Sequence, residues 1–424
     1  MSLRSKIGKY RRVMVNFFSL SMINGVSYLL ALITMPYLIR VLGEERYGAY
    51  LFIYTVAQYL LLAGNYGFRF SVTRQISVHR DDNNRVNEIF NATIMARLII
   101  SLAVVLPVLA AVAIFMDGDD VLMYLFALGI VFGDILIPVW LFQGLEEMKY
   151  LTIVNVISKF VFAGLIFIFI TKESDYVYVV LLNSMGYIAA GVASLWIAMK
   201  HFGIKFAMPT FAAVKAQYRD GWHIFVSNIG MELYRNSNIF LLRVFAGEAA
   251  VGIYGAVEKI VKAVQTILNA LPMALFPYIS RLFYGEKSAD NVTVLMRLVK
   301  WAFLLLSVVA VAFVLSSKLL YIYLGLDIDF EIARTLVWLM APVLLFGCMN
   351  YIVGIVGLLN LGAAKSFQRN IWISAVISVS FMLIFCNEYS YYAAAAAWTI
   401  AELLLFILCL FSLRNIKRRK EVTL

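Results

Sequence analysis

Long apolar runs separated by short charged breaks extend along the whole chain. A bilayer core of about 30 Å needs about 20 apolar residues per helix. Twelve such runs lie near residues 13–39, 47–68, 92–116, 121–143, 151–171, 176–199, 222–246, 250–280, 293–316, 331–360, 369–387 and 391–413. The pattern predicts an all-α integral membrane protein with twelve transmembrane helices.

The composition agrees with this pattern. Hydrophobic residues make up 63% of the 424 residues and charged residues only 14%, whereas a soluble domain carries about 25% charged residues. No polar stretch is long enough to form a soluble body. Cys348, Cys386 and Cys409 all lie in apolar runs, so they indicate no disulfide framework or metal cluster. A soluble enzyme is excluded.

Basic residues are concentrated on alternate connections between the predicted spans. If the N-terminus is cytoplasmic, the even-numbered connections are cytoplasmic too, and the positive-inside rule expects Lys and Arg there. The outer connections hold only Arg40, Arg46, Lys172 and Lys318, whereas the inner connections and the termini carry most of the rest. Both termini are therefore expected on the cytoplasmic side.

One motif occurs twice along the chain. The pattern Gly-Glu-x-x-x-Gly-x-Tyr lies at residues 43–50 and again at 247–254, each time shortly after an Arg-Val pair. Six spans, an even number, separate the copies, so both copies have the same orientation. This predicts two parallel six-helix bundles related by an axis along the membrane normal, with the transport path between them. We place the bundles at residues 1–205 and 206–424.

Charged residues also occur inside the predicted spans. A charge at a helix centre costs about 2.5–3.5 kcal/mol on insertion scales, so such a residue faces a cavity or a partner. The basic ones are Arg97, Lys159, Arg235, Arg243, Lys259, Lys262, Arg297, Lys300 and Arg334, and the acidic ones are Asp134, Glu232, Glu258 and Glu402. The positive excess indicates a water-filled cavity that accepts an anion such as phosphate.

Simpler explanations remain open for several of these charges. Snorkelling to the headgroups accounts for those within about two turns of a span end, which are Arg97, Arg243, Arg297, Lys300 and Arg334. Asp134 and Lys159 are both near mid-membrane on adjacent antiparallel helices, where they can pair. Two further pairs have the spacing of contacts within one helix, Glu232 with Arg235 and Glu258 with Lys262.

The first part of the chain resembles a known family. The resemblance is carried by Pro-Tyr-Leu-Ile-Arg-Val-Leu-Gly (36–43), Tyr-Gly (47–48), Asn-Tyr-Gly-Phe (65–68) and Thr-Arg-Gln-Ile (73–76), and more loosely by Val-Gly-Ile-Tyr (251–254). These segments are similar to the bacterial polysaccharide transporter family, in particular to Wzx-type O-antigen flippases of the multidrug/oligosaccharidyl-lipid/polysaccharide superfamily. The resemblance implies two six-helix bundles in a V shape. It also implies translocation of an undecaprenyl-pyrophosphate-linked oligosaccharide from the cytoplasmic to the outer leaflet of the inner membrane.

With this resemblance the interior charges become candidate cargo contacts. We expect the pyrophosphate or the sugars to contact Arg97, Lys159, Arg235, Lys259 and Lys262. We expect these cations to be balanced by acids that also serve as sites for a coupling proton or sodium ion, namely Asp134, Glu232 and Glu258. No other cofactor, no metal and no nucleic acid is expected. The expected partners are the lipid-linked oligosaccharide, membrane lipids and other polysaccharide assembly proteins.

Two other functions stay open at this point. A multidrug or organic-ion antiporter of the same superfamily needs acidic partners for cationic drugs, and the positive interior disfavours it. An integral-membrane polysaccharide polymerase or glycosyltransferase is expected to carry a substantial extramembrane loop with a catalytic constellation. The sequence contains no nucleophile motif, zinc-ligand spacing or phosphate-binding glycine loop. A transporter is therefore expected rather than an enzyme.

Overall fold

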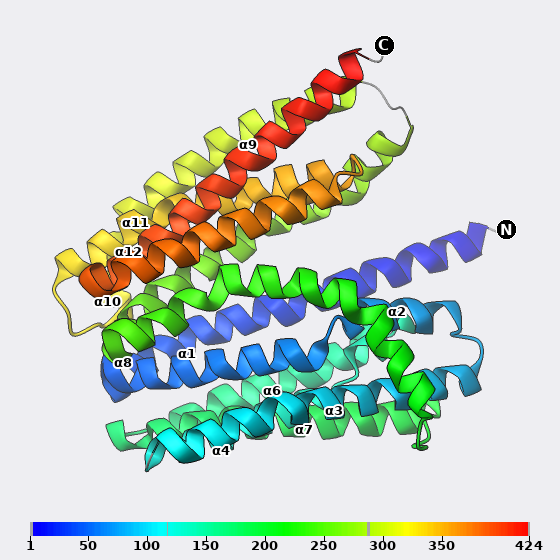
Figure 1. Ribbon diagram of the computed structural model, residues 1–424, viewed down its shortest axis with the longest axis horizontal. Helices are drawn as coiled ribbons and strands as arrows, with labels where there is room; N and C mark the ends of the chain where they lie inside the picture. The colour runs from blue at the N-terminus through cyan, green and yellow to red at the C-terminus, as the bar shows by residue number, and fades with distance from the viewer. Residues whose placement is uncertain (1–2, 117, 286–288, 423–424) are drawn as a thin grey trace. The chain divides into compact units, whose positions relative to one another are not determined.

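The structure is built from helices. The computed structural model describes residues 3–116, 118–285 and 289–422, which contain no strand, and it describes side chains for most of residues 25–269 and 295–416. The elements, shown in Figure 1, are α1 (Leu3–Asn65), α2 (Phe68–Val78), α3 (Asn83–Phe115), α4 (Asp119–Ile135), α5 (Val139–Gly144), α6 (Met148–Phe169), η1 (Glu173–Asp175), α7 (Tyr176–Phe202), α8 (Phe211–Gly285), α9 (Ala289–Leu315), α10 (Ser317–Leu324), α11 (Phe330–Asn350), η2 (Tyr351–Leu359) and α12 (Ala364–Val422). The predicted all-helical class is confirmed.

Membrane-length helices account for most of the described chain. Nine helical runs in the described ranges are long and apolar enough to cross a membrane. Three long helices each contain one residue with a non-helical backbone. These residues are Gly43 in α1 (φ 74°), Gly247 in α8 (φ 85°) and Ser390 in α12 (φ 47°). Because such a conformation ends helical geometry, each of these elements consists of two helical segments. The three turns fall where the hydropathy pattern placed breaks between predicted spans.

Two predicted spans differ in detail from the structure. The span predicted at 121–143 is broken, because α4 ends at Ile135 and α5 begins only after Pro138. Proline lacks an amide hydrogen and its ring clashes with the preceding turn, so it does not continue the helix. The span predicted at 331–360 changes after Asn350 into the π-helix η2.

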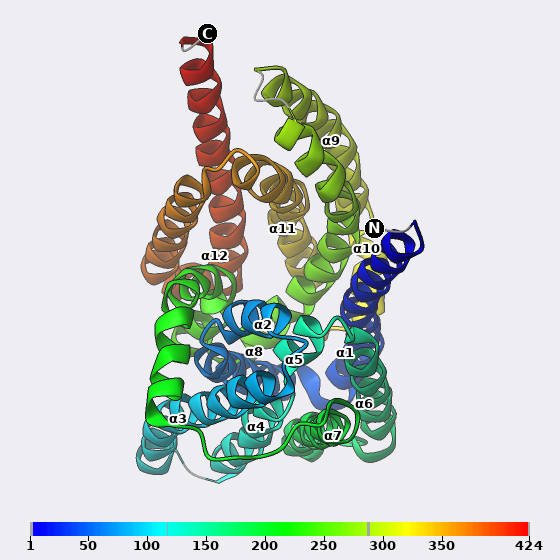
Figure 2. The ribbon, with the colours of Figure 1, turned by 90° about the vertical axis from the view of Figure 1, so that its right-hand side faces the viewer.

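The chain divides into two compact units. Unit 1 comprises Met1–Tyr37 and Ile53–Ile229, and unit 2 comprises Leu38–Phe52 and Gly230–Leu424. Figure 2 looks along the helices of unit 1, where α7 packs against both α4 and α6. The turn of α1 at Gly43 therefore belongs to unit 2, although the two segments that it joins continue into unit 1.

The connections of unit 1 gather at its two ends. At one end Arg80 Nη1 lies 3.8 Å from Glu146 Oε2, which links the connections after α2 and α5. At the other end the Tyr37 hydroxyl donates to the carbonyl oxygen of Ile170 at 2.7 Å. The 22 residues of α6 separate these two contacts. This alternation of the connections matches the one that the charge pattern predicts.

The two copies of the repeated motif contact each other in unit 2. A Cβ atom on Gly48 would overlap the carbonyl oxygen of Glu248, and a Cβ atom on Gly252 would overlap the carbonyl oxygen of Glu44. The contact is reciprocal, because the second glycine of each copy meets the backbone of the glutamate in the other. Only a residue without a side chain allows two backbones to approach so closely. The repeat is therefore a packing motif.

We expect Gly48→Ala and Gly252→Ala to lower the stability of the purified protein. The added methyl group must push two backbones apart, and overpacking of this kind costs about 1–3 kcal/mol. Thermal unfolding in detergent measures the loss. Gly164→Ala in α6 is the control, because a Cβ atom there meets nothing within 4 Å. An equal effect in all three variants would contradict the packing role.

Candidate functional site

A buried arginine is the centre of a polar cluster in unit 1, which we call the Arg97 cluster. The Arg97 side chain in α3 is 2% exposed, and its Nη2 atom lies 2.6 Å from Asp134 Oδ2 and 3.1 Å from Asn65 Oδ1. Its Nη1 atom donates to the carbonyl oxygens of Ile135 and Ile137 at 3.2 and 3.4 Å. Both terminal nitrogens of the guanidinium are therefore engaged by the protein, whereas its buried Nε atom has no hydrogen-bond partner among the described residues.

The helix breaks around this cluster supply its acceptors. The last carbonyl groups of a helix have no partner within the helix, and the gap between α4 and α5 leaves the carbonyl groups of Ile135 and Ile137 turned toward Arg97. Asn65 is the last residue of α1 and also donates to Asp134 Oδ2 at 3.3 Å. Arg97 thus satisfies backbone groups that the Pro138 break exposes, which is a structural role.

Lys159 is not part of the ion pair between Arg97 and Asp134. It was a possible partner of Asp134, yet the structure places Asp134 with Arg97 and Lys159 beside Ser27, to whose hydroxyl it donates. Lys159 is half-buried on α6, one turn after Asn155. Among the side chains that the structure describes, no carboxylate is within salt-bridge distance of Lys159. A hydroxyl neutralises none of its charge, so Lys159 can still attract an anion.

A second polar cluster, the Glu258 cluster, lies on α8 in unit 2. Glu258 is 3% exposed, and its Oε1 atom lies 3.1 Å from Lys262 Nζ, one helical turn away. The Tyr254 hydroxyl donates to the same oxygen at 3.5 Å and accepts from the Asn238 amide at 3.2 Å. The pairing within one helix that the spacing of Glu258 and Lys262 predicts is present.

Lys259 in this cluster contacts aromatic rings. Its Nζ atom lies 5.3 Å from the ring centre of Tyr47 and 5.6 Å from that of Tyr50, both in the first copy of the motif. The Nζ atom of Lys262 lies 5.8 Å from the ring centre of Trp398. In the described part of the chain, no carboxylate forms a salt bridge with Lys259. Cation–π contacts hold an ammonium group without a carboxylate on it, although the neighbouring Glu258 acts on Lys259 electrostatically.

Other predicted charges contribute less to a site. Glu232 accepts a hydrogen bond from the Asn236 amide at 2.6 Å. The side chain of Arg235 lies outside the described residues. Arg297 and Lys300 are exposed on α9, as snorkelling residues are expected to be.

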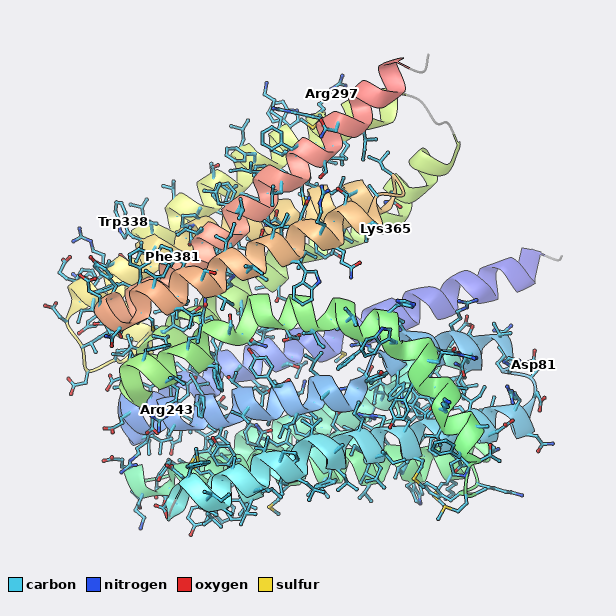
Figure 3. The ribbon with its side chains drawn as sticks, in the orientation of Figure 1. Asp81, Arg243, Arg297, Trp338, Lys365 and Phe381 are labelled. Carbon is cyan, nitrogen blue, oxygen red and sulfur yellow. The ribbon has the colours of Figure 1, made fainter. Side chains whose placement is uncertain are left out.

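Two arginines that snorkelling would explain form ion pairs instead. Arg243 Nη2 lies 2.5 Å from Glu248 Oε1, and Arg334 Nη1 lies 2.8 Å from Glu331 Oε1. Figure 3 shows Arg243 at the end of the unit 2 helices opposite to Lys365. Much of the positive excess predicted for the interior is therefore compensated locally.

Sequence reasoning missed one buried polar pair. The Asn350 amide donates to Glu402 Oε2 at 2.7 Å and to the Glu402 carbonyl oxygen at 2.9 Å, and both residues are at most 6% exposed. The sequence pattern places Glu402 inside a predicted span but indicates neither a role for it nor Asn350 as its partner. An asparagine within an apolar run is the signal that points to Asn350, and equally to Asn65.

Comparisons with known proteins agree on one family. The family described as "Polysaccharide biosynthesis protein" matches residues 13–283. A protein of Escherichia coli (strain K12) named "Putative O-antigen transporter" is 26% identical over 408 residues, which cover 95% of this chain and 97% of that protein. A "Putative O-antigen transporter" of Shigella dysenteriae is 29% identical over 279 residues, covering 65% of this chain and 69% of that protein.

Solved structures share the fold at low sequence identity. The "Lipid II flippase MurJ, inward closed conformation" superposes with a TM-score of 0.74 at 12% identity, covering 96% of this chain and 91% of that chain. An inward-facing multidrug resistance MATE family transporter of the MOP superfamily gives a TM-score of 0.69 at 14% identity, covering 94% and 99%. The chain thus shares the fold of these two structures.

The pairing of Arg97 with Asp134 predicts a non-additive pattern of stability. Arg97→Met should destabilise the protein strongly, by about 3–5 kcal/mol, because it leaves Asp134 buried without its partner. Adding Asp134→Leu should recover part of the loss. Thermal unfolding of single and double variants measures this coupling, with Arg85→Ala, in an exposed pair, as the neutral control. Strictly additive losses would argue against the pair.

Proposed function

Because this chain belongs to the polysaccharide biosynthesis protein family, we propose that it is a flippase of the Wzx type in the bacterial inner membrane. Its cargo is an undecaprenyl-pyrophosphate-linked oligosaccharide, the repeat unit of O-antigen or a related surface polysaccharide. The observation that carries this proposal is the pair of lysines, Lys159 and Lys259, which lie within apolar helices and form no salt bridge with a described carboxylate. The names of the curated relatives support the same cargo class.

The proposed architecture has twelve spans with both termini in the cytoplasm. Counting the two segments of α1, α8 and α12 separately turns the nine apolar runs into twelve. Two six-helix halves, residues 1–205 and 206–424, would then rock against each other in alternating access. The cargo is carried unchanged, so the protein is a transporter and not an enzyme.

Lys159 and Lys259 can each supply a positive charge to a pyrophosphate, and the contacts that they give up in doing so differ. Lys159 gives up only a hydroxyl contact and Lys259 only ring contacts when a phosphate oxygen approaches. Arg97 and Lys262 already hold carboxylates, so they add to the positive field without being free to bind. The same pairing disfavours a multidrug antiporter, because the carboxylates that a cationic drug would need are occupied.

Ion coupling is part of the proposal. A proton or sodium ion that binds Asp134 or Glu258 competes with Arg97 or Lys262 for the same oxygen atoms. Binding of the ion would therefore neutralise the carboxylate beside that cation and strengthen the positive field that acts on the cargo, and loss of the ion would reverse this. Glu232, which accepts from Asn236, offers a third carboxylate of this kind.

Removing either lysine should reduce transport without loss of protein. Lys159→Ala and Lys259→Ala each remove a charge-assisted contact worth about 1.5–3 kcal/mol, which corresponds to at least about tenfold less surface polysaccharide if the contact limits flipping. Quantified surface polysaccharide and immunoblots of membrane fractions measure both quantities. Lys300→Ala on the exposed face of α9 is the matched control. Full activity in both test variants would remove the basis of the assignment.

Deletion of the gene tests the function itself. The flippase proposal expects the lipid-linked oligosaccharide to accumulate on the cytoplasmic leaflet, because synthesis continues while transport stops. Extraction of the lipid fraction, with leaflet assignment by a non-permeant sugar-oxidising reagent, measures this. Complementation with the intact chain should clear the accumulated lipid. A deletion strain without accumulation contradicts the proposal.

A further inference from the structure

An aromatic cluster lies at the end of α1 in unit 1, outside both polar clusters. The Tyr66 ring stacks on the Phe225 ring with their centres 4.4 Å apart and an interplanar angle of 23°. Tyr218 meets the same ring edge-on at 5.2 Å, and the Trp222 ring centre lies 6.4 Å away. We call Tyr66, Tyr218, Trp222 and Phe225 the Tyr66 cluster.

The backbone that carries Tyr66 is strained. Tyr66 has φ 39° and Gly67 has φ 77°, so two successive residues are left-handed and the first of them has a side chain. The turn is held by the first part of α8, because a Cβ atom on Gly221 would lie 2.7 Å from the Tyr66 carbonyl oxygen. A bulky residue in this region of the Ramachandran map is rare, and such strain is found preferentially at binding and switch sites.

Two members of the cluster have polar atoms that remain available. The Tyr66 hydroxyl and the Trp222 indole N–H form no hydrogen bond with any residue that the structure describes, and Trp222 is 50% exposed. Tyr218 differs, because its hydroxyl donates to the Ala96 carbonyl oxygen at 2.6 Å. The cluster therefore presents the exposed Trp222 ring together with hydrogen-bonding groups at the edges of Trp222 and Tyr66.

Charged groups adjoin these rings. Asn65, directly before Tyr66, is bonded to both Arg97 and Asp134. Arg69, three residues after Tyr66, is exposed at the start of α2. The Arg97–Asp134 ion pair thus contacts the residue before Tyr66, and a cation follows Tyr66 closely along the chain.

We propose that Trp222, with Tyr66 and Phe225 beside it, forms a stacking subsite for a pyranose ring of the cargo. A pyranose has apolar C–H faces and a rim of hydroxyl groups, which match the ring faces and the available edge groups. This subsite rests on the proposed function.

Binding to full-length protein in nanodiscs tests the subsite with two probes. One probe is undecaprenyl-pyrophosphate-linked oligosaccharide, and the other is undecaprenyl pyrophosphate without sugar. Trp222→Leu should weaken binding of the glycosylated probe about tenfold, as expected for loss of aromatic stacking, and leave the sugar-free probe unchanged. Tyr66→Phe, which keeps the ring but removes the hydroxyl, should weaken only the glycosylated probe and by less.

Controls separate the subsite from a membrane anchor, the usual role of Trp and Tyr at an interface. Phe70→Leu on α2 is the matched control, since Phe70 is 59% exposed and is not part of the Tyr66 cluster. It should change neither affinity. If Trp222→Leu weakens both probes equally, or neither, the sugar subsite is wrong. If the intact protein binds neither probe, the proposed function fails and the subsite with it.

Discussion

The cost of placing charge in apolar surroundings shapes the interior of both units. Arg97 is the clearest case, because its guanidinium is surrounded by one carboxylate, one side-chain amide and two backbone carbonyl groups. Those carbonyl groups are available only because α4 stops before Pro138. The charge and the helix break therefore depend on each other, since either one alone would leave polar groups buried without partners.

The repeated motif shows that shared packing does not imply shared chemistry. Its two glycines make equivalent backbone contacts, so this part of unit 2 is symmetric. Its two terminal tyrosines differ, because the Tyr50 ring lies beside Lys259 whereas the Tyr254 hydroxyl donates to Glu258. The duplicated sequence thus preserves the close approach of two backbones. The surrounding residues determine which of the two tyrosines lies beside a cation and which donates to a carboxylate.

Hydropathy and charge predicted the local features of the fold, including the turns at Gly43 and Gly247 and the ion pair along α8. They did not predict which helices meet. Asp134 was expected to have Lys159 available as a partner across one hairpin, but it binds Arg97, 37 residues away. Periodicity records which face of a helix is polar and carries no information on the neighbour opposite that face. For this reason the candidate charges were identified from sequence, and their partners were not.

The difference between paired and unpaired cations bears on how a carrier releases its cargo. A carrier must bind its substrate firmly enough to load it and weakly enough to let it leave. A phosphate at Lys262 would have to displace Glu258 from a 3.1 Å ion pair, whereas at Lys259 it would displace ring contacts worth about 0.5–2 kcal/mol. Lys159 and Lys259 can therefore exchange partners at small cost in both directions. The buried pairs hold the surrounding helices in place and do not need to break for cargo to bind at these two lysines.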